Sequence, residues 1–108
     1  MRRRSALLSA VLACIPLALA AAPLTPAREQ ELHNLLYQDC GSCHGMRLTG
    51  GLGPALTPQA LAGKPRDLLL ATIRDGRAGT PMPPWKGLLG EDDIAWLVDT
   101  LLAAETHP

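Results

Sequence analysis

The amino-acid sequence predicts an all-α protein with one domain. Apolar residues recur at helical spacing in three segments, and glycine- and proline-rich stretches separate those segments. No segment shows the alternation of apolar and polar residues that is typical of a strand. The 108 residues of the chain are enough for a single domain.

The N-terminal segment has the features of a secretory signal peptide. Three arginines at positions 2–4 precede an apolar run over residues 6–22, and Ala18-Leu19-Ala20 fits a cleavage site. A membrane anchor is the alternative, because the run is nearly long enough to span a bilayer, but Pro16 interrupts it. The expected division of the chain is a cleaved signal peptide at 1–20, a short tail at 21–26 and the domain at 27–108.

Export changes the charge of the chain and its cysteine content. The sequence has ten basic and ten acidic residues, so loss of the three arginines leaves seven against ten, a net charge of −3. Cys14 belongs to the cleaved run, and the mature chain then has two cysteines. The sequence contains no basic patch interleaved with aromatic residues, so we expect no nucleic-acid partner. We expect a periplasmic protein without stable membrane insertion after cleavage.

The first predicted helix begins at Thr25 and leads into Cys40. Thr25 and Pro26 suit the N-cap and the first helical position, and acidic residues follow in the first turns. Leu32, Leu36 and Cys40 share one face at helical spacing. This helix therefore presents an apolar face and then a cysteine.

Two further helices and two loops complete the predicted domain. Pro65 opens a helix from residue 66 to about residue 74, and Gly76 stops it. Gly90, followed by acidic residues, opens a last helix that runs to about residue 104. The segments predicted to be loops from their glycine and proline content are residues 45–58 and 79–85.

The most informative motif is the sequence Cys40-Gly41-Ser42-Cys43-His44. C-x-x-C-H is the attachment sequence of a c-type haem. Two cysteines three residues apart present their sulfurs from one helix face, which suits thioether bonds to the two vinyl groups of a porphyrin. His44 is then placed to bind the iron as an axial ligand. The motif predicts one covalent haem c, held by Cys40 and Cys43.

Three other interpretations of the motif explain less. A thioredoxin-like C-x-x-C would need a βαβ setting, and the following histidine would be incidental. A zinc site would need a fourth ligand at a second short-spaced pair, which the sequence lacks. A disulfide between residues three apart would close a very small loop and constrain little.

Met82 is the predicted second axial ligand. It follows His44 by 38 residues, enough chain to reach the opposite face of a haem, and its flanking prolines limit the entropy lost on binding. A buried, gap-filling methionine is the alternative. Met46 lies too near His44 in the sequence, and His107 lies at the C-terminus. A His/Met pair raises the reduction potential relative to two histidines and favours electron transfer over oxygen chemistry.

These segments together resemble the small class I cytochromes c. The resemblance covers nearly all of the mature chain, including the C-x-x-C-H motif, Gly53-Pro54-Ala55-Leu56, Met82-Pro83 and the terminal helix. It implies three to four helices packed around one haem, with the first and last helices in contact. It also implies that the carbonyl oxygen of Pro54 accepts a hydrogen bond from the imidazole of His44 and so orients it.

Two loops, residues 47–56 and 79–85, resemble those of the NirC-type cytochromes, which are encoded with the cytochrome cd nitrite reductase of denitrifying bacteria. The resemblance implies an electron carrier, not an enzyme, which serves that reductase. An electron-transfer partner in d-type haem maturation is the alternative, and a haem enzyme or sensor with a displaceable sixth ligand is a third interpretation. We expect a monomer, with exchange of the Met82 loop between two chains as the alternative.

The exposed haem edge near Cys40 and Cys43 is the predicted surface for electron exchange. Docking there should be brief and should involve a small contact patch. Four basic residues are interpreted as solvated charges, with pairing to haem propionates or guidance of a partner as the alternative. These residues are Arg47, Arg74, Arg77 and Lys86.

Overall fold

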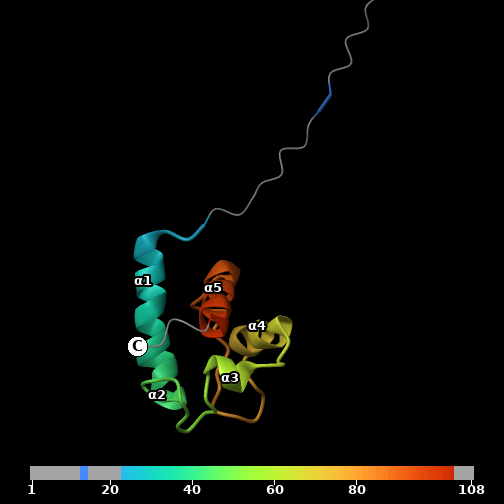
Figure 1. Cartoon of the computed structure of the whole chain (residues 1–108). Helices are drawn as coiled ribbons and strands as arrows, with labels where there is room; N and C mark the ends of the chain where they lie inside the picture. Colours follow the sequence, from blue (N-terminus) through green and yellow to red (C-terminus); the bar gives the residue numbers. More distant parts are fainter. Residues whose placement is uncertain (1–12, 15–22, 104–108) are drawn as a thin grey trace, which may run out of the picture.

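The fold is helical throughout the part of the chain that the structure describes. The computed structural model describes residues 13–14 and 23–103, so the predicted signal peptide lies almost wholly outside the described residues. These residues form helices and loops without a strand, and the all-α prediction is confirmed. The elements in order are α1 (Pro26–Leu35), a π-helical turn η1 (Leu36–Cys40), α2 (Gly41–His44), α3 (Pro58–Leu61), α4 (Arg66–Asp75) and α5 (Glu91–Leu102) (Figure 1).

The helix boundaries follow local capping signals. The Thr25 hydroxyl accepts a hydrogen bond from the Arg28 amide at 3.2 Å, which satisfies one of the free donors at the start of α1. Gly76 ends α4 with a φ of 68°, a left-handed conformation that favours glycine. The Asp93 carboxylate accepts from the Gly90 amide at 3.0 Å at the start of α5. Helix α5 ends at Leu102, two residues before the predicted end.

Two elements depart from the sequence prediction. The turn η1 joins α1 to α2 within one continuous helical stretch, and the Gly41 amide bonds the carbonyl five residues earlier, at Leu36. This wider turn ends at Cys40, the first cysteine of the motif. The predicted loop over residues 45–58 is wrong at its end, because Pro58 begins the short helix α3. Thr57 caps this helix by accepting from the Ala60 amide at 3.2 Å.

The core lies between the α1–α2 stretch and the other helices. Figure 1 shows α1 and α2 along one side of the molecule, with α5 and α4 on the other side and α3 near the end where α2 lies. Leu32 and Leu36 share one buried cluster with residues of α5, so the contact between first and last helices that the resemblance implies is present. The buried members of the cluster are Leu32, Leu36, Leu48, Leu61, Leu89, Ile94, Leu97 and Leu101.

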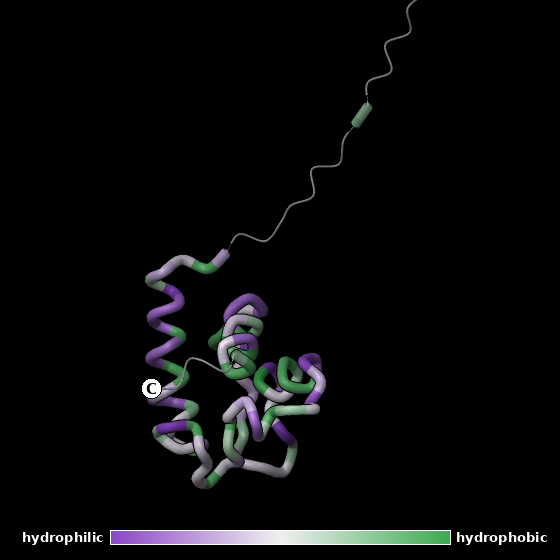
Figure 2. Tube along the Cα trace, in the orientation of Figure 1, coloured by the Kyte–Doolittle hydropathy of each residue, from purple (hydrophilic) through white to green (hydrophobic). Residues whose placement is uncertain are grey.

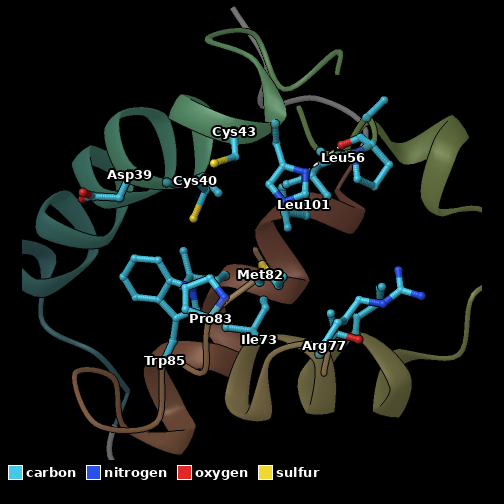
Figure 3. Close-up of a pocket in the computed structure, with 18 of the residues that line it drawn as sticks. Asp39, Cys40, Cys43, Leu56, Ile73, Arg77, Met82, Pro83, Trp85 and Leu101 are labelled. Atoms are coloured by element: carbon cyan, nitrogen blue, oxygen red, sulfur yellow. Dashed lines mark hydrogen bonds between the residues drawn. The ribbon is translucent and has the colours of Figure 1, made fainter. Parts of the chain in front are cut away.

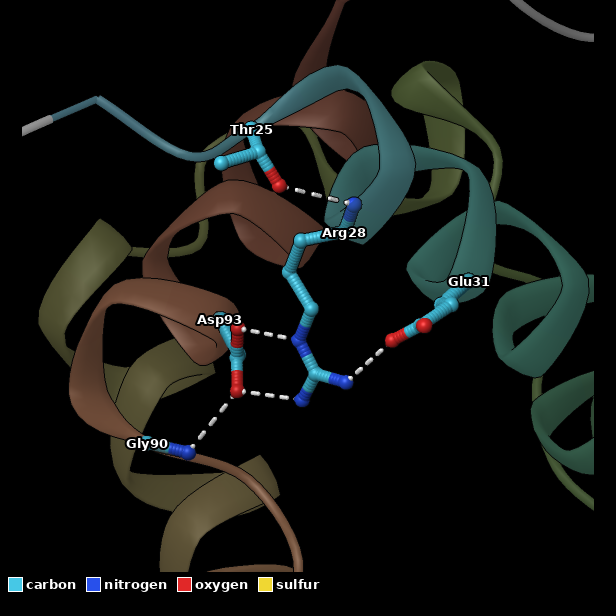
Figure 4. A network of polar contacts seen from close by, with 5 residues as sticks. All are labelled: Thr25, Arg28, Glu31, Gly90 and Asp93. Atoms are coloured by element: carbon cyan, nitrogen blue, oxygen red, sulfur yellow. Dashed lines mark hydrogen bonds and ion pairs between the residues drawn. The ribbon is translucent and has the colours of Figure 1, made fainter.

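An ion pair between Arg28 and Asp93 joins α1 to α5 (Figure 4). The guanidinium donates to both carboxylate oxygens, at 3.0 Å from Nε and 2.7 Å from Nη2, and its third nitrogen donates to Glu31 at 2.7 Å. Asp93 is 9% exposed, and its hydrogen bonds with Arg28 hold the pKa of this carboxyl below its usual value. The paired charge is therefore tolerated at the edge of an apolar core.

Helices α1 and α4 bury few of their residues against the rest of the described chain. Hydrophilic residues alternate with apolar ones along α1 (Figure 2), and Leu32 is its one buried residue. Helix α4 has no buried residue although Leu69, Leu70 and Ile73 are all apolar. None of the described helices combines the length and the apolar character that a membrane span requires.

Candidate haem site

A cavity of about 1140 Å³ lies between the C-x-x-C-H motif, α3, α4, α5 and the loop that carries Met82. Leucine side chains from the helix before the motif, the loop after it, α3, α4 and α5 form much of its wall. The apolar face of α4 borders this space through Leu69 and Ile73, which explains why α4 has no buried residue. A large, flat, apolar group suits a cavity of this size and lining.

Cys40 and Cys43 lie together at one side of the cavity. Figure 3 shows both sulfur atoms projecting from the helix toward the cavity, with Trp85 and Met82 across from them. Both cysteines are free; Cys40 is half-buried and Cys43 is exposed. Burial, with a contribution from the charge of Asp39, raises the pKa of the Cys40 thiol to about 11. This thiol is therefore protonated at neutral pH before any thioether bond forms.

The ring of His44 is oriented by the carbonyl group of Pro54. Nδ1 of His44 lies 2.7 Å from this oxygen. A carbonyl oxygen can only accept, so Nδ1 carries the proton and Nε2 keeps a free electron pair for a metal. His44 lines the cavity, and the hydrogen bond that the resemblance implies is present in the structure.

The loop that contains Pro54 folds back onto the end of α2. The amides of Gly50 and Gly53 donate to the carbonyls of His44 and Cys43, each at 2.8 Å, which satisfies acceptors that a helix leaves free at its end. Gly50 has a φ of 111°, which favours glycine. This loop therefore positions Pro54 relative to the motif through main-chain bonds.

Met82 lines the same cavity from the loop that follows α4. Figure 3 places its sulfur across the cavity from Cys43, next to Pro83. Met46 is 68% exposed and lies outside the cavity lining, and His107 lies outside the described residues. Met82, and not Met46, therefore lines the same cavity as His44.

The basic residues near the site differ in their surroundings. Arg74 donates to both oxygens of Glu91, at 2.8 and 3.0 Å, and Lys86 lies 3.5 Å from Asp75. Arg74 is therefore held in an ion pair, whereas Lys86 is ion-paired but remains 65% exposed to solvent. The remaining two predicted residues are exposed, and one of them, Arg77, lines the cavity. Lys64 and Asp39 also line it, although no sequence motif marks either residue.

The side chains that line the cavity fit a haem c. They do not fit a zinc site or a thioredoxin-like motif. Within residues 13–14 and 23–103, no three His, Cys, Asp or Glu side chains come together as a metal site. A thioredoxin-like setting would need strands beside the motif, and the described residues form none. Two thiols, an imidazole with Nε2 available and a thioether surround an apolar space, which is the donor set of a haem c with His/Met ligation.

A helical domain that closes around such a space, with C-x-x-C-H on one side and a methionine on the other, defines a c-type cytochrome. Comparison with known proteins gives the same class. Residues 27–99 match the family described as cytochrome C oxidase, cbb3-type, subunit III. The chain is 67% identical to cytochrome c55X of Pseudomonas aeruginosa over 81 residues, which are 75% of this chain and 68% of that relative.

Two solved structures share the fold. The c-type cytochrome NirC is 62% identical with a TM-score of 0.76, and the match covers 79% of this chain and all of NirC. The dihydro-heme d1 dehydrogenase NirN in complex with DHE is 32% identical with a TM-score of 0.64, over 69% of this chain and 16% of NirN. The chain belongs to the c-type cytochromes, in the family of cytochrome c55X and NirC, and haem c is the cofactor that this membership implies.

Proposed function

We propose that this chain is a periplasmic monohaem cytochrome that carries single electrons in denitrification, to cytochrome cd nitrite reductase. Cys40 and Cys43 hold the haem through thioether bonds, and His44 and Met82 bind its iron. The observation that carries the proposal is the arrangement of these four side chains around one apolar cavity, with His44 oriented by Pro54. The similarity to NirC supports the assignment to denitrification.

The side chains of the site suit electron transfer more than bond chemistry. The haem supplies a one-electron iron couple when it is bound. His44 presents Nε2 while Pro54 keeps its ring from rotating, and this hydrogen bond makes the imidazole a stronger donor. Met82, as the second ligand of a bound haem iron, would leave no open position for an oxygen compound. The leucine side chains of the lining offer water no hydrogen-bonding partner.

The periplasmic location rests on the N-terminal sequence. We assign residues 1–20 to a cleaved signal peptide, residues 21–26 to a tail and residues 27–108 to the cytochrome domain. The family match begins at residue 27, and α1 begins at Pro26, which supports the start of the domain. The two cysteines of the mature chain are both used for haem attachment, which fits maturation outside the cytoplasm.

A second candidate function is electron transfer during d-type haem maturation. The similarity to a segment of the dihydro-heme d1 dehydrogenase NirN favours it. The fold and the haem ligands would be the same for both functions, and the partner would differ.

Rapid mixing of purified proteins distinguishes the two candidates. The reduced cytochrome is mixed with oxidised cytochrome cd nitrite reductase, and the oxidised cytochrome is mixed separately with the dihydro-haem d1 dehydrogenase and its substrate. Fast oxidation by the reductase supports the main proposal. Negligible oxidation together with fast reduction by the dehydrogenase supports the second candidate, and negligible rates in both mixtures overturn both.

The optical spectrum tests the closed His/Met site independently of the partner. The oxidised protein should show a methionine–iron charge-transfer band that persists after modest additions of nitrite, peroxide or cyanide. Loss of the band on addition of nitrite or peroxide would favour an enzyme or sensor with a displaceable sixth ligand.

A further inference from the structure

The segment after Met82 completes the C-terminal end of α4. A helix leaves its last carbonyl groups without partners inside the helix. Here the Trp85 amide donates to the Ile73 carbonyl at 3.0 Å, and the Lys86 amide donates to the Arg74 carbonyl at 3.2 Å. The returning chain is therefore fixed to the last turn of α4 by main-chain bonds.

The loop before this segment is also closed by hydrogen bonds. The Arg77 amide donates to the Met82 carbonyl at 3.2 Å, and the Met82 amide donates to the Thr80 hydroxyl at 3.3 Å. The Thr80 hydroxyl in turn donates to the Arg77 carbonyl at 2.7 Å. Both polar main-chain groups of Met82 are thus held, and its position depends on where α4 ends.

Main-chain atoms of the Met82 loop lie very close to Gly76. A Cβ atom at Gly76 would lie 2.6 Å from the Met82 carbonyl oxygen, 2.7 Å from the Pro83 carbonyl carbon and 2.8 Å from the Pro84 nitrogen. All three are main-chain atoms, so no side-chain rotation relieves these contacts, and the two prolines restrict main-chain adjustment. Any side chain at Gly76 must therefore move the Met82–Pro84 segment.

We propose that Gly76 is a positioning residue for the sixth ligand: the missing side chain lets the Met82 loop lie close against α4, at the depth from which the Met82 sulfur reaches the iron. The inference rests on the proposed function, in which Met82 is that ligand. The reason is the close approach of main-chain atoms to Gly76; the positive φ of Gly76 would not be sufficient by itself.

Gly79 provides a matched control in the same loop. Its φ is 75° against 68° for Gly76, but a Cβ atom at Gly79 would meet nothing within 4 Å. Gly76→Ala and Gly79→Ala therefore both place an alanine at a positive φ, and Gly76→Ala alone introduces the contact with main-chain atoms. Both variants are prepared as holoproteins, with haem attachment verified by mass and helix content by circular dichroism.

The readouts are the methionine–iron charge-transfer band and cyanide binding to the oxidised protein. We expect Gly76→Ala to keep its helix content but to lose most of the band and to bind cyanide roughly tenfold more tightly, or more, as overpacking displaces the ligand. Gly79→Ala should show the same charge-transfer band and the same cyanide affinity as the unmodified protein.

Three results would overturn the inference: an unchanged band in Gly76→Ala, an equal loss in Gly79→Ala, or a loss that accompanies unfolding of the helices. Failure of the proposed ligation is recognised separately. In that case the unmodified protein lacks the band, or Met82→Ala retains it, whatever the glycine variants show.

Discussion

Nδ1 of His44 lies 2.7 Å from the carbonyl oxygen of Pro54, and the absence of a side chain at Gly53 allows this approach. A Cβ atom at Gly53 would lie 2.8 Å from both Cε1 and Nδ1 of the His44 ring. The loop between the motif and α3 therefore determines the orientation of the proposed iron ligand. A main-chain carbonyl cannot be removed by substitution, so Gly53 is the position at which this relationship can be tested.

Gly53→Ala should raise the reduction potential. The added methyl group displaces the ring and weakens the hydrogen bond to Pro54, so the imidazole donates less electron density to oxidised iron. A redox titration of the holoprotein measures the change. Gly87→Ala is the control, because a Cβ at Gly87 meets nothing within 4 Å. A potential that is equal in the two variants would contradict this role of Gly53.

Met82→Ala should abolish the methionine–iron charge-transfer band, whereas Met46→Ala should keep it. Met82 borders the cavity, and Met46 is exposed outside its lining. The oxidised optical spectrum of each holoprotein is the measurement. The reverse pattern would assign the sixth ligand to Met46.

Leu36→Ala should lower the free energy of unfolding by about 2–5 kcal/mol, the usual cost of such a truncation in a core. Leu36 is 1% exposed and packs in the central cluster, so its loss leaves a void. Leu88→Ala should change the same quantity by less than about 0.5 kcal/mol, since Leu88 is 75% exposed and lies outside the cavity lining. Denaturant titration of both holoproteins is the measurement, and equal losses would argue against the packing described.

Asp93 should contribute to the dependence of stability on pH. The hydrogen bonds from Arg28 lower the pKa of this carboxyl in the folded chain below its ordinary value of 3.8. Its ionised form therefore stabilises the fold fully above that ordinary value, and this contribution is lost as the pH falls through the lower folded pKa.

Asp93→Asn should accordingly lower stability at neutral pH and reduce the further loss on acidification below about pH 4. Asp92→Asn serves as the control, because Asp92 is exposed in the same turn of α5 and has no ion pair within the described chain. Thermal unfolding of each holoprotein at several pH values gives the comparison. Parallel profiles for Asp93→Asn and the unmodified protein would show that the ion pair with Arg28 does not contribute.

The double variant Cys40→Ser, Cys43→Ser, produced without haem, should lose most of its helix content. The apolar face of α4 borders the cavity, and no residue of that helix is buried by the rest of the chain. A cofactor bound only by the folded form shifts the folding equilibrium toward it. A native-like circular dichroism spectrum of the haem-free variant would refute this expectation.

The helix boundaries were predictable where a few adjacent residues determine them. Thr25 caps α1 and Gly76 ends α4 as expected, because both signals act within one turn. The π turn Leu36–Cys40 has no signature in residue spacing, and its main-chain bonds depend on how the whole helix packs. The ion pair of Arg28 with Asp93 joins residues 65 positions apart, so no local pattern reveals it.

The candidate site was predictable to a similar extent. The motif and a proline-flanked methionine identify Cys40, Cys43, His44 and Met82, and the structure arranges all four around one cavity. Their roles as tethers and ligands stay predictions. Lys64 was not foreseen, because it reaches the cavity lining only through the packing of the segment between α3 and α4. The tight contact of Gly76 with the Met82 loop likewise requires coordinates.

The hydrogen bonds from Trp85 and Lys86 to the end of α4 have a consequence for the kinetics of electron exchange. A loop that shares the main-chain bonds of a helix cannot swing away from the cavity without breaking them. With Met82 bound to iron as proposed, the bond lengths and angles around the metal then change little between oxidation states. The internal reorganisation energy would then be small, and the speed of exchange would depend on the distance and orientation of the partner.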